Sequence, residues 1–442
     1  MKIIRAPGHT GLRVYCLHAK VDTDPGPSQS PFTVVFTHRR LMIAVLVAAI
    51  GAASQAATVL VGSGGCDVSD HDCHPPSAPQ IAAIHLDGTP TTFATTAGAP
   101  SWLQLSHDSA CLFAVQTTTN RVLSFAMADS GLSGPISDVP SGGSFPVKLD
   151  LSLDGGLLFV ANYGQATDDA SVATLIVAEG CKLATGVSLA FHRPSIDPDR
   201  QQGSHIHTVV TDVAASSATS TRLFACDLGG DAIYTLSAAA DGGLVHVSTV
   251  LVTPGSGPRH LAIHPSLRVA YVVFEMANAI GSFSIGEGSR LEALQPPLRT
   301  VDASLPTCLG RLPFNGSATG SLSPSSSCSK VAEVVVTPNG RSVYASNRGF
   351  GSALTNTIAG FRVNATDGRL APVELATPSG TSYPRGMQLS KDGAHLFVAG
   401  QGSANLVRLA VAPAGEPGTL DPTAVQVQAG LATPTTVVPL LA

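Results

Sequence analysis

The 442-residue sequence predicts an all-β protein, and three features support this prediction. The chain contains 44 Gly and 31 Pro residues, which favour turns over long helices. Short runs rich in Val, Leu, Phe and Thr recur between clusters of Gly, Pro, Asp and Asn, as is typical of strands joined by turns. Amphipathic patterns long enough for helices are almost absent. The net charge of −5 indicates no basic surface of the kind that binds nucleic acid.

An internal repeat narrows this prediction to one architecture. Each copy has a Pro or His at its start, an apolar strand, a polar turn, a second apolar strand, a polar loop and a third strand. The six copies begin at Ala99, Phe145, His205, Gly257, Lys330 and Tyr383. Their spacing of roughly 45–75 residues is near the period of propeller blades, and the less regular stretch after each third strand can supply a fourth. Six aligned copies disfavour the alternative, a β-sandwich with chance similarity.

A seventh blade can be assembled from both ends of the repeat region. The segments ATVLVGSGG, QIAAIHLDG and TTFATTAG, within residues 57–98, lack the inner strand that opens every other copy. The segment TPTTVVPL at residues 433–440 can supply that strand. Such closure leaves no open sheet edge. The sequence therefore predicts an all-β, seven-bladed β-propeller over residues 57–442, closed by N- and C-terminal strands that share one blade.

The N-terminal region is predicted to be a targeting segment. Two arginines precede an apolar run at Leu41–Ala53, and Ser54-Gln55-Ala56 fits a small-x-small cleavage site. If translation starts at Met42, residues 42–56 form a signal peptide, and residues 1–41 are a gene-model extension or disordered. An internal apolar strand and a membrane anchor are the alternatives. We expect a secreted protein with no stable membrane insertion, since the apolar run is short for a membrane span.

Cysteines and glycosylation sequences agree with secretion. Cys66 with Cys73, and Cys308 with Cys328, each bracket a Gly/Ser/Pro-rich loop and could form local disulfides. The remaining three lie in or beside apolar runs and are expected to be buried thiols, with room for one further pair: Cys111, Cys181 and Cys226. Asn315 and Asn364 begin N-x-Ser/Thr acceptor sequences, the first of them in an expected insertion loop.

Polar residues gather at the starts of inner strands and the ends of second strands. Arg259 opens the fifth blade and Glu275 ends its second strand, so an antiparallel pair places both at one edge of the sheet. His205 and His207 open the fourth blade on one face of a strand. Other blades carry charged or polar residues at corresponding places: Lys148 and Arg385 at strand starts, and Gln116, Asn162, Asp227 and Arg348 at second-strand ends. We expect these positions to converge at one mouth of the central channel.

Each candidate also has a simpler interpretation. His205 and His207 could form a metal pair, but no third ligand lies at a recognisable spacing, so no metal is predicted. Asp227 could hold a turn, Arg385 could cap loop carbonyls, and Lys148 could be a solvated charge. The sequence has no G-x-S-x-G or P-loop motif, and VGSGGCD does not match G-x-G-x-x-G, so no cofactor is expected.

Three pairs of segments resemble the seven-bladed lactonase propellers: DPDRQQGSHIHTVV with FACDLGGD, GPRHLAIHP with VVFE, and TPNGRSVYASNRG with NTIAGFRV. That family includes the bacterial-type 6-phosphogluconolactonases and the fungal 3-carboxy-cis,cis-muconate cyclases. The resemblance covers about residues 57–442 and implies a site at one channel mouth. By matching motif it implies functional roles for four residues: His207, Arg259, Glu275 and Arg348. The chain departs from the pattern at Lys148, where similar proteins often have histidine, and at Gln116, where an acid is common.

The resemblance implies a lactone hydrolase acting on a sugar-acid or related anionic lactone. The alternatives are a lactonizing enzyme of the carboxymuconate cyclase type, acting on a dicarboxylate, and a secreted propeller that binds without turnover. Arg259 and Arg348 are expected to hold the acid group and stabilise an oxyanion or enolate. Glu275 and His207 are the predicted acid/base residues. The remaining expected contributors are His205, which would orient His207, and the substrate-binding residues Arg385 and Lys148.

Overall fold

The computed structural model describes residues 58–64, 79–86, 91–128, 131–165, 170–305, 328–350, 355–411 and 416–440. Over these ranges the chain forms β-strands and short 3-10 turns, with no α-helix. The predicted signal peptide at 42–56, the segment before it at 1–41 and Asn315 lie outside the described residues. In the described part of the chain, no helix has the length and apolar character needed to cross a membrane.

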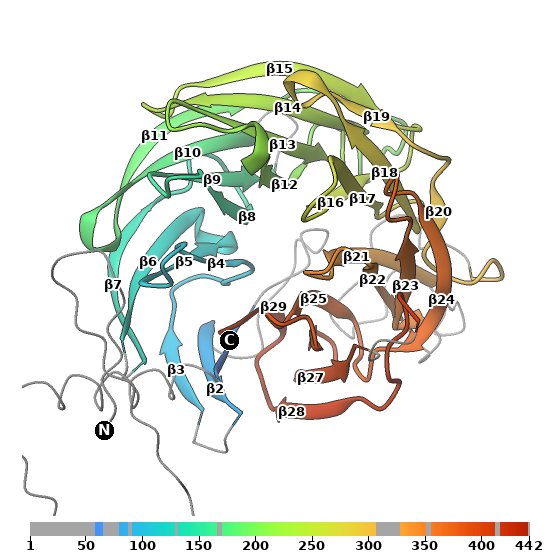
Figure 1. Ribbon diagram of the computed structural model, residues 1–442. Helices are drawn as coiled ribbons and strands as arrows, with labels where there is room; N and C mark the ends of the chain where they lie inside the picture. Colours follow the sequence, from blue (N-terminus) through green and yellow to red (C-terminus); the bar gives the residue numbers. More distant parts are fainter. Residues whose placement is uncertain are drawn as a thin grey trace, which may run out of the picture. The chain divides into compact units, whose positions relative to one another are not determined.

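The strands form seven antiparallel sheets, which we call blades 1 to 7 (Figure 1). From the inner to the outer strand, blade 1 contains β29 (Pro434–Pro439), β1 (Thr58–Ser63), β2 (Gln80–His85) and β3 (Thr92–Thr95). Blade 2 contains β4 (Leu103–Leu105), β5 (Cys111–Gln116), β6 (Arg121–Ala128) and β7 (Gly131–Pro140), and blade 3 contains β8 (Pro146–Leu151), β9 (Leu157–Asn162), β10 (Ser171–Ala178) and β11 (Lys182–Ala190). Blade 4 contains β12 (Ile206–Thr211), β13 (Ser220–Asp227), β14 (Ala232–Ala239) and β15 (Leu244–Leu251).

Blade 5 contains β16 (Pro258–Ile263), β17 (Val269–Phe274), β18 (Ala279–Ile285) and β19 (Leu291–Ala293), and β20 (Leu298–Arg299) also pairs with β18. Blade 6 contains β21 (Cys328–Val336), β22 (Ser342–Phe350), β23 (Thr357–Val363) and β24 (Leu370–Pro378). Blade 7 contains β25 (Pro384–Leu389), β26 (His395–Gly400), β27 (Asn405–Ala410) and β28 (Val425–Ala429). The six sequence copies correspond to blades 2 to 7, which confirms the predicted repeat.

Blade 1 joins the two ends of the propeller. The C-terminal strand β29 pairs antiparallel with β1, with Val61 opposite Val437. It therefore supplies the inner strand that the N-terminal segments lack, as predicted. Figure 1 shows the inner strands of the seven blades around a common centre. The pairing leaves no open edge between the first and last sheets.

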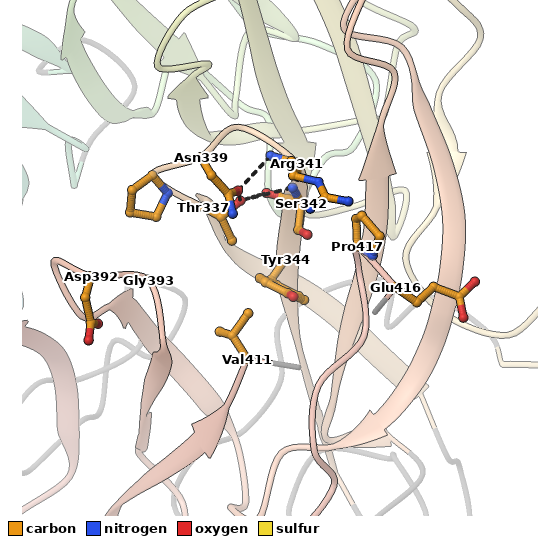
Figure 2. A pocket seen from close by; sticks show the side chains of 11 residues that line it. Thr337, Asn339, Arg341, Ser342, Tyr344, Asp392, Gly393, Val411, Glu416 and Pro417 are labelled. Atoms are coloured by element: carbon orange, nitrogen blue, oxygen red, sulfur yellow. Dashed lines mark hydrogen bonds between the residues drawn. The ribbon is translucent and has the colours of Figure 1, made fainter. Parts of the chain in front are cut away.

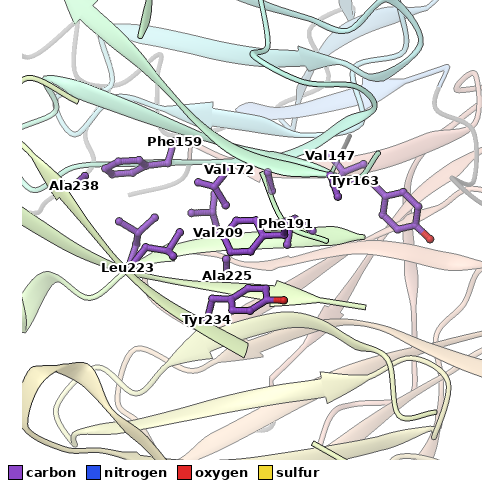
Figure 3. Close-up of a cluster of buried hydrophobic side chains, with 14 of the residues drawn as sticks. Val147, Phe159, Tyr163, Val172, Phe191, Val209, Leu223, Ala225, Tyr234 and Ala238 are labelled. Atoms are coloured by element: carbon purple, nitrogen blue, oxygen red, sulfur yellow. The ribbon is translucent and has the colours of Figure 1, made fainter. Parts of the chain in front are cut away.

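Apolar side chains fill every interface between neighbouring blades. Seven clusters of buried residues occur in the described chain, and each draws its members from two adjacent blades. Figure 3 shows one of them, in which Phe159 and Val172 of blade 3 pack with Leu223 and Ala225 of blade 4. The second strands are buried on both faces; every residue of β17, for example, is buried. This explains why these strands read as continuous apolar runs rather than as alternating ones.

A disulfide joins two blades where separate thiols were expected. Cys111, at the start of β5, is bonded to Cys181 in the 3-10 turn η3 (Glu179–Cys181), 70 residues away. The sequence favours separate buried thiols but leaves room for one further pair, and this bond is that pair. Neighbouring blades bring the two cysteines together. Cys226 is a buried free thiol, as expected. Cys328 is disulfide-bonded, and Cys66, Cys73 and Cys308 lie outside the described residues.

Candidate active site

β-Bulges occur in the inner strand of six of the seven blades, at or near its start in five of them and in the middle of β21. In each, the register between the inner and second strands shifts by one or more residues. The bulged residues are Thr435, Val147, His207, Arg259 with His260, Ala332 with Glu333, and Arg385. A bulge breaks the alternation of a strand and re-aims the side chains in it. Three charged side chains near the centre of the propeller come from these bulges, those of Arg259, Glu333 and Arg385.

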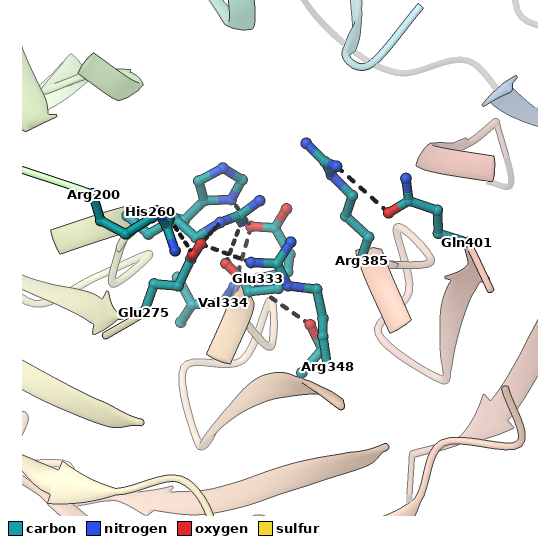
Figure 4. A network of polar contacts seen from close by, with 11 residues as sticks. Arg200, His260, Glu275, Glu333, Val334, Arg348, Arg385 and Gln401 are labelled. Carbon is teal, nitrogen blue, oxygen red and sulfur yellow. Dashed lines mark hydrogen bonds and ion pairs between the residues drawn. The ribbon is translucent and has the colours of Figure 1, made fainter. Parts of the chain in front are cut away.

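Glu275 is the centre of a buried ion cluster (Figure 4). It follows β17 directly and is 2% exposed. Its Oε1 lies 2.7 Å from Nη2 of Arg200, and its Oε2 lies 2.9 Å from Nε of Arg259 and 2.7 Å from Nη2 of Arg348. We call these four residues the Glu275 cluster. The structure thus brings Arg259, Glu275 and Arg348 together, as the strand geometry predicts, and adds Arg200 from the connection that leads into blade 4.

The charges in this cluster do not balance. Burial alone would raise the pKa of Glu275, but the charges of Arg348, Arg200, Arg259 and Lys330 hold that pKa well below its usual value. Glu275 is therefore a carboxylate, and it offsets only one of three guanidinium charges. Burial, together with the charge of Arg348, lowers the pKa of Arg259 to about 9. The cluster carries a net positive charge in a place with little access to water.

More buried cations surround the cluster. Six cationic side chains at this mouth are each at most 7% exposed: Lys148, Arg200, Arg259, Lys330, Arg348 and Arg385. Carboxylates among the described residues that act on these cations include Glu275, Glu333 and Asp150. Arg385 extends from the bulge of β25, with Nη1 3.5 Å from Oε1 of Gln401, and Figure 4 shows it opposite the Glu275 cluster. The mouth therefore suits an anionic ligand.

His207 is a buried imidazole in contact with two other rings. Its ring centre lies 5.6 Å from that of Tyr163 and 5.0 Å from that of His260. Among the described residues, neither of its ring nitrogens has a hydrogen-bond partner. Burial, reinforced by the positive charge of Arg259, lowers its pKa well below 6.5. His207 is therefore neutral near pH 7.

His205 lies against Tyr163 rather than in the ion cluster. The two rings stack with centres 4.2 Å apart, and Nδ1 of His205 is 3.1 Å from the Tyr163 carbonyl oxygen. Tyr163 thus contacts both histidines, so any influence of His205 on His207 passes through this ring. The described residues contain no group of three His, Cys, Asp or Glu side chains arranged to hold a metal.

Asp227 holds a turn. Its Oδ1 accepts hydrogen bonds from the backbone N–H groups of His205 at 2.6 Å and Gly230 at 2.8 Å, and its Oδ2 accepts one from the Tyr234 hydroxyl at 3.0 Å. The structure also corrects its alignment with Glu275. Asp227 is the last residue of β13 and pairs with Ala232, whereas Glu275 comes one residue after the corresponding position.

The same one-residue difference separates two sets of side chains at the second-strand ends. The residues opposite the first residue of the third strand are Gln116, Asn162, Asp227, Phe274, Asn347 and Gly400. Asn162 and Asn347 in this set donate to backbone carbonyls of Ser141 and Thr300. The next residues include Tyr163, Glu275, Arg348 and Gln401, which make the contacts of the site. Gln116 and Asn162 therefore do not correspond to Glu275, because successive strand residues face opposite sides.

Lys148 also belongs to a second polar group on the inner strands, next to the Glu275 cluster. The ammonium of Lys148 is 4.2 Å from the centre of the Trp102 ring, and Nδ1 of His260 is 2.6 Å from Oε1 of Glu333. The Trp102 ring meets His260 edge-on at 5.7 Å. A cavity of about 120 Å³ here is lined by Trp102, Glu333, Met387 and Thr436, from four different blades. Burial lowers the pKa of Lys148 and raises that of Glu333, although each charge partly offsets the effect on the other.

A larger cleft, of about 380 Å³, lies away from these residues (Figure 2). It is lined by turn residues of blades 6 and 7, including Thr337, Arg341, Asp392 and Gly393, and by Tyr344. The turn at 337–341 joins β21 and β22 at the end of β22 opposite Arg348. None of the predicted site residues lines this cleft.

Residues 83–438 match the family described as lactonase, 7-bladed beta-propeller. The chain belongs to this lactonase family. It is 25% identical over 360 residues to a protein of Arthroderma benhamiae named "Probable 6-phosphogluconolactonase", covering 79% of this chain and 83% of the relative. It is 28% identical over 269 residues to the 6-phosphogluconolactonase of Bacillus subtilis, covering 60% of this chain and 66% of the relative. Among solved structures, the periplasmic gluconolactonase of Pseudomonas aeruginosa is 26% identical with a TM-score of 0.67, covering 86% of this chain and 98% of that one.

Several residues of this lactonase-family site were missed from the sequence. Arg200 lies on a connection, so an argument based on strand ends could not find it. His260 and Glu333 lie within the inner strands β16 and β21 rather than at their starts. In a regular strand, the side chain of each would face the opposite side of the sheet from the residue before it. The bulges place them in the channel instead. The available signal was the pair of polar residues, Arg259 and His260, side by side in an otherwise apolar strand.

Proposed function

We propose that this lactonase-family protein hydrolyses an anionic sugar-acid lactone to the open hydroxy acid. The observation that carries the proposal is the gathering of six buried cationic side chains at the channel mouth. Guanidinium and ammonium groups bind carboxylate and phosphate groups through charge-assisted hydrogen bonds, so this gathering suits an anionic substrate. The names of the relatives, 6-phosphogluconolactonase and periplasmic gluconolactonase, support lactones of sugar acids as the substrate class.

In this proposal the guanidinium groups bind the substrate and its transition state. Arg259 and Arg348 hold the anionic group and stabilise the oxyanion that forms when water attacks the lactone carbonyl. Arg385 and Lys148 contribute further positive charge from blades 7 and 3. Arg200, which also binds Glu275, belongs to the same binding surface.

Glu275 has a different proposed role from the acid/base one that the sequence suggests. Both oxygens of its carboxylate already contact guanidinium groups, which leaves neither open to take a proton from water. Its contacts with Arg200, Arg259 and Arg348 fix those guanidinium groups in place before substrate arrives. We therefore propose that Glu275 orients the arginines and that neutral His207 exchanges protons with the substrate, supported by Tyr163 and His205.

A substrate panel tests the proposal. The purified protein is assayed with 6-phosphogluconolactone, glucono-δ-lactone and 3-carboxymuconate. We expect ring opening of the lactones, with the phosphorylated one preferred. Cyclisation of 3-carboxymuconate without lactone hydrolysis would contradict the proposed hydrolase activity and indicate a lactonizing enzyme. Absence of turnover on all three would favour a binding protein.

We also propose that the protein is secreted. The Cys111–Cys181 disulfide supports this, since such bonds persist mainly in oxidising compartments. Asn364 is exposed, as a glycosylated asparagine must be, and one solved relative is named periplasmic. N-terminal sequencing of the protein from the culture medium is expected to begin at Ala57. A product that starts at Met1 and stays inside the cell would contradict secretion.

A further inference from the structure

The pair formed by His260 and Glu333 has no role in the proposal above. Both side chains are 3% exposed. Nδ1 of His260 lies 2.6 Å from Oε1 of Glu333, and the same Oε1 accepts the backbone N–H of Val334 at 3.1 Å. Figure 4 shows the pair beside the Glu275 cluster, with Arg385 opposite. The carboxylate is thus fixed by its own backbone and by blade 5 at once.

The other nitrogen of His260 is unoccupied. Among the described residues, Nε2 has no hydrogen-bond partner although it is buried. His264, four residues further along the same strand region, behaves as a structural histidine does. Its Nδ1 accepts the backbone N–H groups of Ser266 and Leu267, and its Nε2 donates to the Gly340 carbonyl at 2.9 Å. Buried polar groups are normally satisfied, so the open Nε2 of His260 indicates a missing partner such as water or substrate.

The surroundings of His260 define its protonation state. The groups that face it are Arg259 on its own strand and, from five other strands, His207, Lys148, Glu333, Arg348 and Arg385. Burial, followed by the charges of Arg259 and Lys148, lowers the pKa of His260 well below 6.5. Because Oε1 of Glu333 already accepts the Val334 N–H, we assign the ring proton to Nδ1, which donates to the same oxygen and leaves the lone pair on Nε2.

We propose that His260 is the general base of the lactone hydrolysis and that Glu333 is its positioning residue. This inference rests on the proposed function and names the group that activates water at the same site. The arrangement is that of an imidazole with one nitrogen fixed by a carboxylate and the other left open, which a general base requires. His207, whose ring centre is 5.0 Å away, then lies within reach of the leaving oxygen.

The reaction balances with water as the only co-reactant. A water oxygen bonds to the lactone carbonyl carbon while one water proton moves to Nε2 of His260, and the carbonyl electrons become an oxyanion that the arginines stabilise. The intermediate then collapses, and the bond from the carbonyl carbon to the ring oxygen breaks. The proton on Nε2 passes to that ring oxygen, directly or through His207, and leaves a hydroxyl group and a carboxylic acid. Glu333 stabilises the imidazolium between these two steps.

Substitutions in the full-length protein test the assignment. We expect H260Q to lower kcat by about 10²–10⁴-fold, with KM and affinity for the aldonate product nearly unchanged. E333Q is expected to lower kcat less, and to move the acid limb of kcat/KM to lower pH because the imidazolium loses its anionic neighbour. E333D is expected to restore part of the loss. H264Q is the matched control: it removes a buried histidine with two occupied nitrogens and should lower the melting temperature without lowering kcat.

Four outcomes decide the proposal. Losses as described, with product binding retained, support it. An active wild-type protein in which H260Q keeps kcat within about threefold overturns the His260 assignment and leaves the lactonase function standing. A wild-type protein inactive on every lactone overturns the proposed function and the assignment together. If H260Q does not fold, E333Q decides, since an unmoved acid limb overturns the pairing.

Discussion

Asp227 and Glu275 lie at nearly the same place in neighbouring blades, and their partners are opposite in kind. Asp227 accepts hydrogen bonds from two backbone N–H groups and a tyrosine hydroxyl, and burial raises its pKa in spite of them. Glu275 has three arginine partners and a pKa well below its usual value. The two positions differ by a single residue relative to the third strand. At the end of the second strand, a residue in the position of Asp227 thus holds the loops in place. A residue one position later, such as Glu275, presents its charge to the channel.

Removing an arginine from the Glu275 cluster should have the largest effect on activity. We expect Arg259→Ala to lower kcat/KM by about 10²–10³-fold, because it removes both an oxyanion donor and substrate charge. Arg259→Lys retains the charge without the fork that contacts Glu275 and should recover only part of the activity. Steady-state kinetics of the two variants measure this difference. Full activity of Arg259→Ala would contradict the placement of substrate at the cluster.

Acid unfolding should separate the two carboxylates. Glu275 has a lowered pKa, so its contribution to the free energy of unfolding is present above its ordinary pKa of 4.5 and is lost as pH falls toward the folded-state value. Glu275→Gln should therefore be less stable than wild type by about 3–5 kcal/mol at neutral pH, and the gap should narrow in acid. Denaturant titrations at several pH values measure it.

Asp227→Asn should show the opposite trend. The pKa of Asp227 is raised from 3.8, so its favourable contribution is present below that value and is lost as pH rises through the folded-state pKa. The difference between Asp227→Asn and wild type should therefore be largest in acid, and kcat should change far less than in Glu275→Gln. If the free-energy difference from wild type changed with pH in the same direction for both variants, the distinction drawn between Asp227 and Glu275 would be wrong.

The smallest effect on activity is expected from the disulfide. Replacing Cys111 and Cys181 by serine removes a cross-link over 70 residues and should lower the free energy of unfolding by about 4 kcal/mol. Because Cys111 lies at the end of β5 opposite Gln116, away from the second-strand ends that form the site, kcat and KM should stay near wild-type values. Thermal melting with and without reductant provides the measurement. A large loss of kcat would contradict the expectation that the disulfide has no influence on the channel mouth.

The repeat made the fold predictable from sequence. Each blade has two apolar runs in a fixed order, and the missing inner strand of blade 1 could be matched to residues 433–440. Part of the site followed by the same logic, since antiparallel pairing requires Arg259 and Glu275 to share an edge.

The rest of the site depends on features that leave little trace in the sequence. Bulges shift Arg259, His260 and Glu333 together into the channel, and no residue type marks a bulge there. The one-residue offset of Asp227 from Glu275 appears only when both are set against the third strand. The cross-blade contacts of Arg200 and the Cys111–Cys181 bond depend on how neighbouring sheets pack.

The most direct test compares kcat/KM for 6-phosphogluconolactone and glucono-δ-lactone in wild type and Arg348→Ala. The two substrates share a ring and differ in one anionic group, so their ratio reports on the buried cations. The account predicts a ratio well above one in wild type that falls by at least about tenfold in Arg348→Ala. Equal values for the two lactones in wild type, or a ratio that Arg348→Ala leaves unchanged, would contradict it.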